Sequence, residues 1–262
     1  MSAPVSPQQL LLPKEHGSWS LAFEPLALGL LAAPSRAGLG LAAAVAAGFF
    51  LRRPLKLAAT LPAADARRTA ARGWVLLLAF AAAAGLGFVA VEGKFLQLWP
   101  LLLSVPPGAL FLLLDLRHDQ RAAAAELAGS TAFALLPAAF ATLAGWPPAP
   151  AFALAAIMLA RSIPTVLTVR AYLRLNKGEP ARASPPLLAA ASAAVLLAIL
   201  AARGWVPMAA PALAALLLGR TVFLTTPLRP AWPARRIGVL EAALGVVYLA
   251  GIVLAYHAQA AH

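Results

Sequence analysis

The sequence has no cysteine and few charged residues. None of its 262 residues is Cys, only 9 are Asp or Glu, and charged side chains make up 11% of the chain. The lack of cysteine excludes disulfides, thiolate nucleophiles and Cys-ligated zinc or iron–sulfur sites. The lack of charge excludes an ordinary soluble domain, in which about a quarter of the residues are charged.

Apolar side chains take the place of the missing charges. They make up 62% of the chain, and the mean hydropathy is +0.82. This composition is typical of a polytopic membrane protein. The apolar runs are continuous and rich in Ala and Leu, whereas the strands of a membrane barrel alternate, so we expect the spans to be helices.

The apolar runs are separated by Pro, Gly or charged residues, and no long polar insertion interrupts them. We therefore expect an all-α polytopic membrane protein with a single domain over residues 1–262. Nine transmembrane helices are expected, at about 18–34, 37–52, 74–91, 96–116, 123–145, 150–173, 185–202, 206–226 and 236–256. The fourth contains Pro106-Pro107-Gly108, which should break the helix.

The formal charge of +12 would suit a nucleic-acid partner, but the distribution of the basic residues does not. Lys and Arg gather in short segments between alternate spans, where they set the topology of a membrane protein. Sixteen of the 21 fall on one side of the nine spans and three on the other, while Arg161 and Arg220 lie within spans. This predicts a multi-pass protein of the bacterial inner membrane with its N-terminus in the cytoplasm and its C-terminus outside.

Polar side chains concentrate at the expected cytoplasmic side, so a site is expected to open there. Lys14 and His16 precede the first span, and Glu24 lies inside it, where a charge costs roughly 2.5 to 3.5 kcal/mol. His16 titrates near neutral pH, and Glu126 lies slightly inside the fifth span. His16, Glu24 and Glu126 are the candidate catalytic groups that would handle protons.

Two polar stripes run along the sixth span. One has cations at i, i+4 and i+7, which favours either exposure to solvent or a bound phosphate, whose oxygens match the planar guanidinium. The other surrounds Pro164. The first stripe is Arg170, Arg174 and Lys177, and the second is Arg161, Thr165, Thr168 and Tyr172.

Arg161 lies well inside this span, so it should be paired or bind a ligand. Its candidate partners are the carboxylates of Glu24, Glu126 and Glu241, for which Arg220 competes. A buried ion pair with a purely structural role is the alternative.

Asp115 and Asp119 lie at i, i+4, a spacing that can hold magnesium through a phosphate. They are weak candidates, because Arg117 and Arg121 share the same turn and can neutralise them. We assign no metal site and leave the cofactor unknown.

Several motifs resemble those of the YwiC-like bacterial membrane proteins. The first is Pro13-Lys14-Glu15-His16-Gly17-Ser18-Trp19, which is followed by Glu24-Pro25 and Gly29. Further matches are Arg52-Arg53-Pro54-Leu55, Glu126-Leu127-Ala128-Gly129, Ala160-Arg161-Ser162-Ile163-Pro164 and Arg235-Arg236-Ile237-Gly238 with Glu241. This resemblance implies a membrane protein and no particular activity.

A more distant resemblance is to the UbiA-type intramembrane prenyltransferases, through nine helices, the same orientation, Gly17-x-Trp19 and Pro25-x-x-x-Gly29. It implies a UbiA-like helical bundle and an isoprenoid diphosphate held by magnesium on two Asp-rich motifs. At those places this sequence reads Phe49-Phe50-Leu51-Arg52-Arg53-Pro54-Leu55-Lys56 and Val169-Arg170-Ala171-Tyr172-Leu173-Arg174. Cations have replaced the carboxylates, so magnesium would lack its usual ligands.

The leading hypothesis is a cytoplasm-facing basic cavity that binds an isoprenoid or lipid (di)phosphate, with prenyl transfer as the candidate reaction. Its candidate substrate-binding residues are Lys14, Arg52, Arg53, Lys56, Arg161, Arg170, Arg174, Lys177, Arg220 and Glu241. Two alternatives stay open: a small-anion transporter that uses Arg161 and Arg220, and a non-catalytic assembly factor for a membrane redox complex. Whether the protein is an enzyme is also open.

Overall fold

The computed structural model describes residues 10–11, 17–117, 123–227 and 229–260. Regular secondary structure in these ranges is helical, as predicted. The helices are α2 (Gly17–Ala32), α3 (Arg36–Thr60), α4 (Ala66–Val91), the 3-10 helix η1 (Phe95–Leu103), α5 (Val105–Leu116), α6 (Ala123–Ala134), α7 (Leu136–Leu143), α8 (Pro148–Asn176), α9 (Ser184–Ala202), α10 (Ala209–Thr225) and α11 (Ala234–Ala260).

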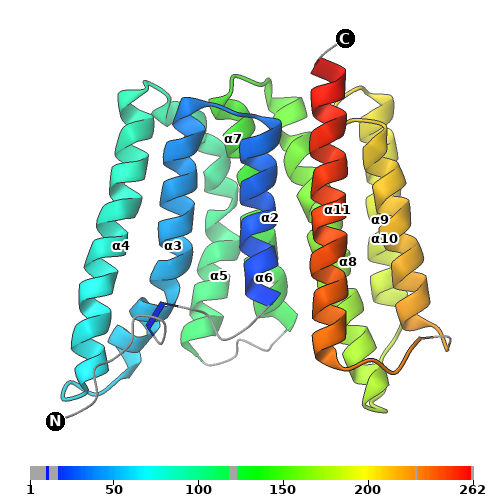
Figure 1. Cartoon of the computed structure of the whole chain (residues 1–262), viewed down its shortest axis with the longest axis horizontal. Helices are drawn as coiled ribbons and strands as arrows, with labels where there is room; N and C mark the ends of the chain where they lie inside the picture. The colour runs from blue at the N-terminus through cyan, green and yellow to red at the C-terminus, as the bar shows by residue number, and fades with distance from the viewer. Residues whose placement is uncertain (1–9, 12–16, 118–122, 228, 261–262) are drawn as a thin grey trace.

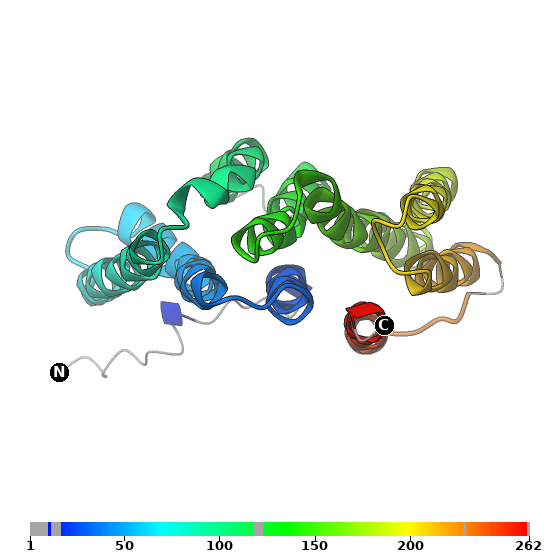
Figure 2. The ribbon, with the colours of Figure 1, turned by 90° about the horizontal axis from the view of Figure 1, so that it is seen from above.

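The helices run up and down between two ends of a flat bundle (Figure 1). Seen from above, they form two layers (Figure 2). One layer holds α4, α3, α2, α11 and α10, and the other holds η1 with α5, α6 with α7, α8 and α9. Short connections make most chain neighbours antiparallel, whereas η1 with α5 and α6 with α7 each continue along one path.

Among the described residues, six helices are long and apolar enough to cross a membrane, and the pair η1–α5, bent by 57°, makes up to seven. The protein is therefore a multi-pass membrane protein. The expected count of nine is not confirmed, because the described parts of α2 and α10 have 16 and 17 residues and a span needs about 20. These two shorter apolar helices stand where the first and eighth spans were expected.

The basic segment after the second expected span is helical and not a loop. α3 continues through Arg52, Arg53 and Pro54, and α4 already begins at Ala66. Arg and Lys are good helix formers, and their long side chains reach polar surroundings from a helix end. The cations therefore project from helices, which fixes the face on which each one lies.

Proline also acts differently from the expectation. The bend in the fourth span falls at Ser104, and Pro106 and Pro107 lie in the first turn of α5. A proline there starts a helix without a lost hydrogen bond, since the first N–H groups have no partner within the helix. Pro137 does the same for α7, so the fifth expected span is divided into α6 and α7.

Burial differs strongly between the helices. In the most apolar stretch of α8, 61% of the residues are buried, against 11% for α4. α4 packs closely on α3, where a Cβ at Gly40 would lie 2.7 Å from the carbonyl oxygen of Gly85. α8 is the centre of the bundle, so charged side chains on its buried faces lie in the interior of the protein.

Candidate functional site

Four charged side chains meet inside the bundle, where α2, α8, α10 and α11 come together. Glu24 comes from α2, Arg161 from α8, Arg220 from α10 and Glu241 from α11. Their side chains are 16%, 3%, 6% and 11% exposed, respectively. We call these four residues the charge cluster. It contains two of the three predicted partners of Arg161, together with Arg220.

The second polar stripe of α8 explains how these helices are held together. The hydroxyl of Thr165 lies beside the charge cluster, and Thr168 lies 3.1 Å from the hydroxyl of Thr221 on α10. Farther along, the hydroxyl of the buried Tyr172 donates to the carbonyl of Pro230, over 2.7 Å, in the segment before α11. The stripe therefore faces α10 and the start of α11.

Arg161 has a nearly complete set of partners. Its Nε and Nη2 atoms donate to the two carboxylate oxygens of Glu24 over 3.0 and 3.1 Å. Nη2 also donates to the backbone carbonyl of Glu241 over 2.9 Å, and Nη1 donates to Thr165 over 3.1 Å. A bidentate arginine–carboxylate pair with its remaining donors satisfied is the arrangement that a buried charge requires.

Arg220 and Glu241 are held less completely. Nη2 of Arg220 donates to Thr165 over 2.9 Å and lies 3.3 Å from Oε2 of Glu241. In the described part of the chain, Nε and Nη1 of Arg220 and both carboxylate oxygens of Glu241 are buried without a hydrogen-bond partner. Each such group costs about 1–3 kcal/mol, and more when it is charged.

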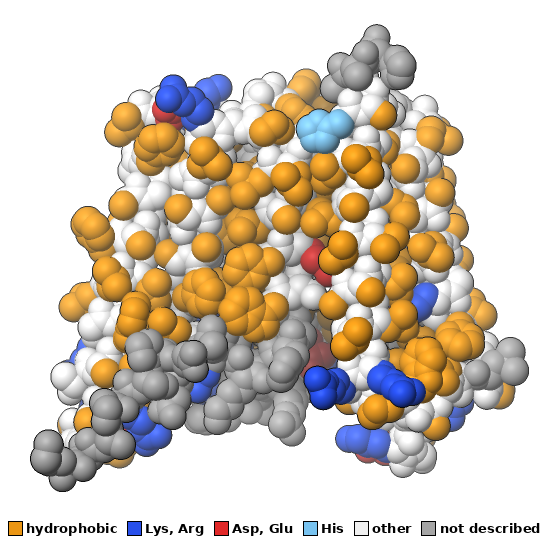
Figure 3. Space-filling view, viewed as in Figure 1, with side chains coloured by type: hydrophobic (Ala, Val, Ile, Leu, Met, Phe, Trp, Pro, Cys, Tyr) orange, Lys and Arg blue, Asp and Glu red, His pale blue; other side chains and the backbone are white. Residues whose placement is uncertain are grey.

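The approach of α11 to α2 depends on a glycine. Gly245 lies one turn after Glu241, and a Cβ at this position would overlap the carboxylate of Glu24 and lie 2.7 Å from Nη2 of Arg161. Figure 3 shows acidic side chains reaching the surface along the line between α2 and α11. Gly245 thus lets α11 close over the charge cluster.

The described basic residues gather at one end of the bundle, where α3, α8 and α10 end and α4, α9 and α11 begin (Figures 1 and 3). We call this the basic end. It carries Arg52, Arg53, Lys56, Arg67, Arg68, Arg72, Arg117, Arg170, Arg174, Lys177, Arg182, Arg229, Arg235 and Arg236, and the opposite end carries Arg36, Lys94 and Arg203. Lys14, His16 and Asp119 were also candidates, and they lie outside the described residues.

At the basic end, the carboxylate of Asp115 forms ion pairs with two cations. Nε of Arg52 lies 2.8 Å from Oδ2, and Nζ of Lys56 lies 3.1 Å from Oδ1. The guanidinium of Arg52 also lies 4.5 Å from the ring centroid of Phe111. Within the described ranges, no three His, Cys, Asp or Glu side chains come together in an arrangement that could hold a metal ion.

The three cations of the first polar stripe of α8 do not converge on a common partner. Arg170 pairs with Glu126 of α6 at 2.9 Å, and the exposed Arg174 lies 3.5 Å from Glu179. Lys177 is exposed. Glu126 is therefore a partner of Arg170 and not of Arg161. The predicted substrate-binding cations divide between the charge cluster, the end of α3 and the end of α8.

A cluster of aromatic rings beside the end of α3 is absent from the list of predicted site residues. Its ring centroids lie 5.3 to 6.3 Å apart, and the rings belong to Trp19, Phe23, Phe49, Phe50 and Phe133. We call it the aromatic cluster. All of its rings except Phe49 are partly exposed. The sequence signal was the pair Phe49-Phe50 one turn before Arg53, together with Trp19 and Phe23 at i, i+4.

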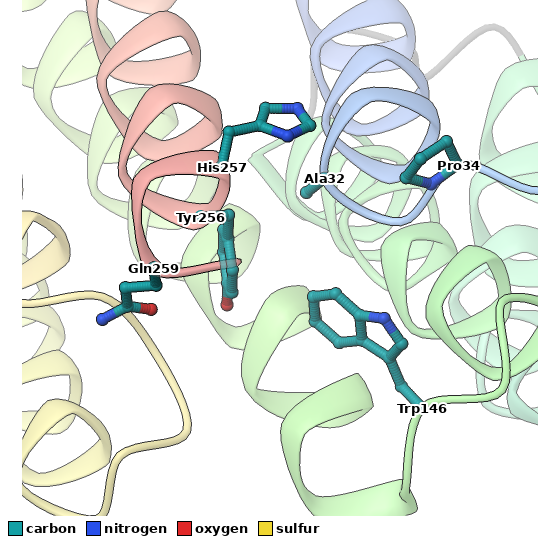
Figure 4. A pocket seen from close by; sticks show the side chains of 6 residues that line it. All are labelled: Ala32, Pro34, Trp146, Tyr256, His257 and Gln259. Carbon is teal, nitrogen blue, oxygen red and sulfur yellow. The ribbon is translucent and has the colours of Figure 1, made fainter. Parts of the chain in front are cut away.

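A pocket of about 460 Å³ lies at the other end of the bundle (Figure 4). It is lined by Ala32, Pro34, Trp146, Tyr256, His257 and Gln259. The imidazole of His257 already lies 3.0 Å from the carbonyl of Leu31, and the lining is mostly apolar. The pocket is thus separate from the charge cluster and the basic end, where the charged groups are.

Comparison with known proteins gives one family. The family described as YwiC-like protein matches residues 12–141, a range that includes Glu24, the aromatic cluster and the end of α3. Arg161, Arg220 and Glu241 lie beyond it. No curated protein and no solved structure matches the chain. The match thus assigns residues 12–141 of the chain to the YwiC-like family.

Proposed function

We propose that this membrane protein binds an isoprenoid or lipid (di)phosphate at its basic end, which faces the cytoplasm by the positive-inside rule. The observation that carries the proposal is the position of Arg53. It lies one turn after Phe49 and Phe50 on α3, and among the described residues it has no hydrogen-bond or ion-pair partner. A cation is thus placed next to an aromatic surface.

The aromatic cluster suits the chain of such a ligand. Four of its five rings are partly exposed, and the rings come from three helices, α2, α3 and α6. Broad apolar rings bury the methyl-branched units of an isoprenoid with little loss of side-chain entropy, since an aromatic side chain has only two rotatable bonds. The headgroup would then lie at the level of Arg53.

The charges at the end of α3 suit a phosphate. Arg52 and Lys56 both contact the carboxylate of Asp115, and Arg53 adds a further cation on the same turn of α3. Guanidinium groups bind phosphate oxygens through short, charge-assisted hydrogen bonds. Binding of this kind needs no magnesium, in contrast to the Asp-rich motifs of the UbiA-type enzymes that the sequence resembles.

Binding is the part of the hypothesis that the geometry supports. Prenyl transfer would also need a group that handles a proton or stabilises the leaving diphosphate. Of the candidates, Glu24 is held by Arg161 and Glu126 by Arg170. The proposal is therefore binding of the lipid phosphate, without prenyl transfer.

The test is thermal unfolding of the purified protein in detergent, with EDTA present, in four conditions: no ligand, geranylgeranyl diphosphate, geranylgeraniol and inorganic diphosphate. We expect the intact lipid diphosphate to raise the unfolding temperature more than either of its parts. Arg53→Ala should lose most of this shift, while the exposed Arg182→Ala, also at the basic end, should keep it. No shift in the wild type, or an equal shift in Arg53→Ala, would refute the proposal.

A further inference from the structure

We infer that Arg220 and Glu241 form a second site, which binds a small inorganic anion together with a proton. This site lies in the charge cluster and is independent of the lipid phosphate proposed at the basic end. It is also the specific observation that favours the small-anion transporter among the alternatives.

The two arginines of the charge cluster differ in how many of their guanidinium nitrogens lack a hydrogen-bond acceptor. Arg161 uses Nε, Nη1 and Nη2 in hydrogen bonds to Glu24, Thr165 and the carbonyl of Glu241. Arg220, whose side chain is 6% exposed, uses only Nη2. Its Nε and Nη1 are buried donors that point to no acceptor in the described part of the chain. Of the two arginines, Arg220 is therefore the one with whole nitrogen atoms left for a further group.

Charge balance sets a condition on that group. With all four side chains ionised, the two carboxylates and the two guanidinium groups cancel. An anion added to this state would leave an uncompensated negative charge inside a membrane protein, which is strongly unfavourable. The anion can bind only when a negative charge is removed at the same time.

Glu241 is the carboxylate that can lose its charge at least cost. Glu24 accepts two hydrogen bonds from Arg161, whereas neither carboxylate oxygen of Glu241 accepts a hydrogen bond from the described residues. Protonation of Glu241 leaves Arg220 uncompensated and creates an O–H donor close to it, since Oε2 lies 3.3 Å from Nη2 of Arg220. An anion could then accept from both residues.

The site thus has two balanced states. In one, Glu241 is ionised and a polar molecule such as water satisfies both partners. In the other, one proton from the solvent resides on Glu241 and one anion accepts a hydrogen bond from Nη1 of Arg220. The other charged groups that face Glu241 are Glu24 of α2 and Arg161 of α8, and the ring of Tyr248 of α11 lies against Arg161.

The experiment measures anion binding and proton uptake in the same protein. Purified full-length protein in detergent is titrated with sodium chloride against sodium gluconate at constant ionic strength, from pH 5 to pH 8, and unfolding temperature and proton uptake are recorded. For the wild type we expect stabilisation by chloride that weakens as pH rises. The chloride affinity should fall about tenfold per pH unit above the titration of Glu241, with about one proton taken up per chloride.

Three variants decide the outcome. Glu241→Gln keeps Arg220 uncompensated, so it should bind chloride equally at all these pH values without proton uptake. Arg220→Gln should lose chloride binding, and Arg170→Gln, which changes an ion pair outside the cluster, should behave as the wild type. Absence of chloride binding in the wild type, or wild-type pH dependence in Glu241→Gln, would overturn the inference. If Arg220→Gln does not fold, Glu241→Gln alone still decides.

Discussion

Arg161 and Glu24 stand 137 positions apart in the sequence and form a bidentate pair, with nitrogen–oxygen distances of 3.0 and 3.1 Å. The pair joins α8, the most buried of the candidate spans, to α2, one of the two shorter apolar helices. The Arg161 side chain is 3% exposed. The position of α2 on the bundle therefore depends on the buried guanidinium of Arg161, which requires the Glu24 carboxylate as its counter-charge.

Removal of one partner of this pair should destabilise the protein strongly. Glu24→Leu leaves the Arg161 guanidinium buried without its carboxylate, and we expect a loss of about 3–5 kcal/mol in the free energy of unfolding. The double variant Glu24→Leu/Arg161→Leu removes both charges and should lose less than the sum of the single variants. A double-mutant cycle by chemical unfolding in detergent measures this coupling, and strictly additive losses would contradict the role given to the pair.

The partners of Arg161 could be predicted from the sequence only in part. A cation in the middle of an apolar span needs a carboxylate, and this argument named Glu24 and Glu241 as partners of Arg161. It could not separate them from Glu126, which belongs to Arg170. That choice depends on the rotation of α6 about its own axis, which the pattern of apolar residues does not fix.

Other features depend on packing between helices. The aromatic cluster joins rings from three helices, so the Phe49-Phe50 pair alone did not reveal it. The sequence also did not predict that the fourth span bends at Ser104. A Pro-Pro pair is compatible with either the break or the start of a helix. The all-α class was predictable because it follows from the length of the apolar runs.

Gly245 provides a test of the contact between α2 and α11. Gly245→Ala adds a methyl group where the Glu24 carboxylate lies, and we expect a loss of about 1–3 kcal/mol in the free energy of unfolding. Gly238→Ala is the matched control on the same helix, because a Cβ there meets no atom within 4 Å. It should be neutral or stabilise by up to about 1 kcal/mol. Equal effects of the two substitutions would show that α11 does not close over the charge cluster.

Asp115 competes with phosphate for the cations at the end of α3. Asp115→Asn removes the charge shared by Arg52 and Lys56, so the unliganded protein should unfold at a lower temperature while its affinity for geranylgeranyl diphosphate rises about tenfold. Glu179→Gln, which changes the exposed pair with Arg174, is the control and should alter neither. A fall in affinity in Asp115→Asn would place the phosphate elsewhere.

The orientation in the membrane can be tested cleanly because the chain has no cysteine. Single cysteines at the exposed positions Lys177 and Arg67 report on the basic end, and single cysteines at Lys94 and Gln259 report on the opposite end. In intact cells, a membrane-impermeant maleimide should label Lys94→Cys and Gln259→Cys only. Labelling of the basic end in intact cells would reverse the orientation and place the proposed phosphate site outside the cytoplasm.

Binding of a lipid phosphate beside Arg53 is the central claim, and native mass spectrometry in the presence of EDTA tests it most directly. The wild type should bind one geranylgeranyl diphosphate at low micromolar concentration, whereas Arg53→Ala should need at least tenfold more ligand, about 1.4 kcal/mol of lost binding energy. Arg182→Ala should match the wild type. Equal occupancy of the wild type and Arg53→Ala, or no bound lipid diphosphate in any of them, would contradict the account.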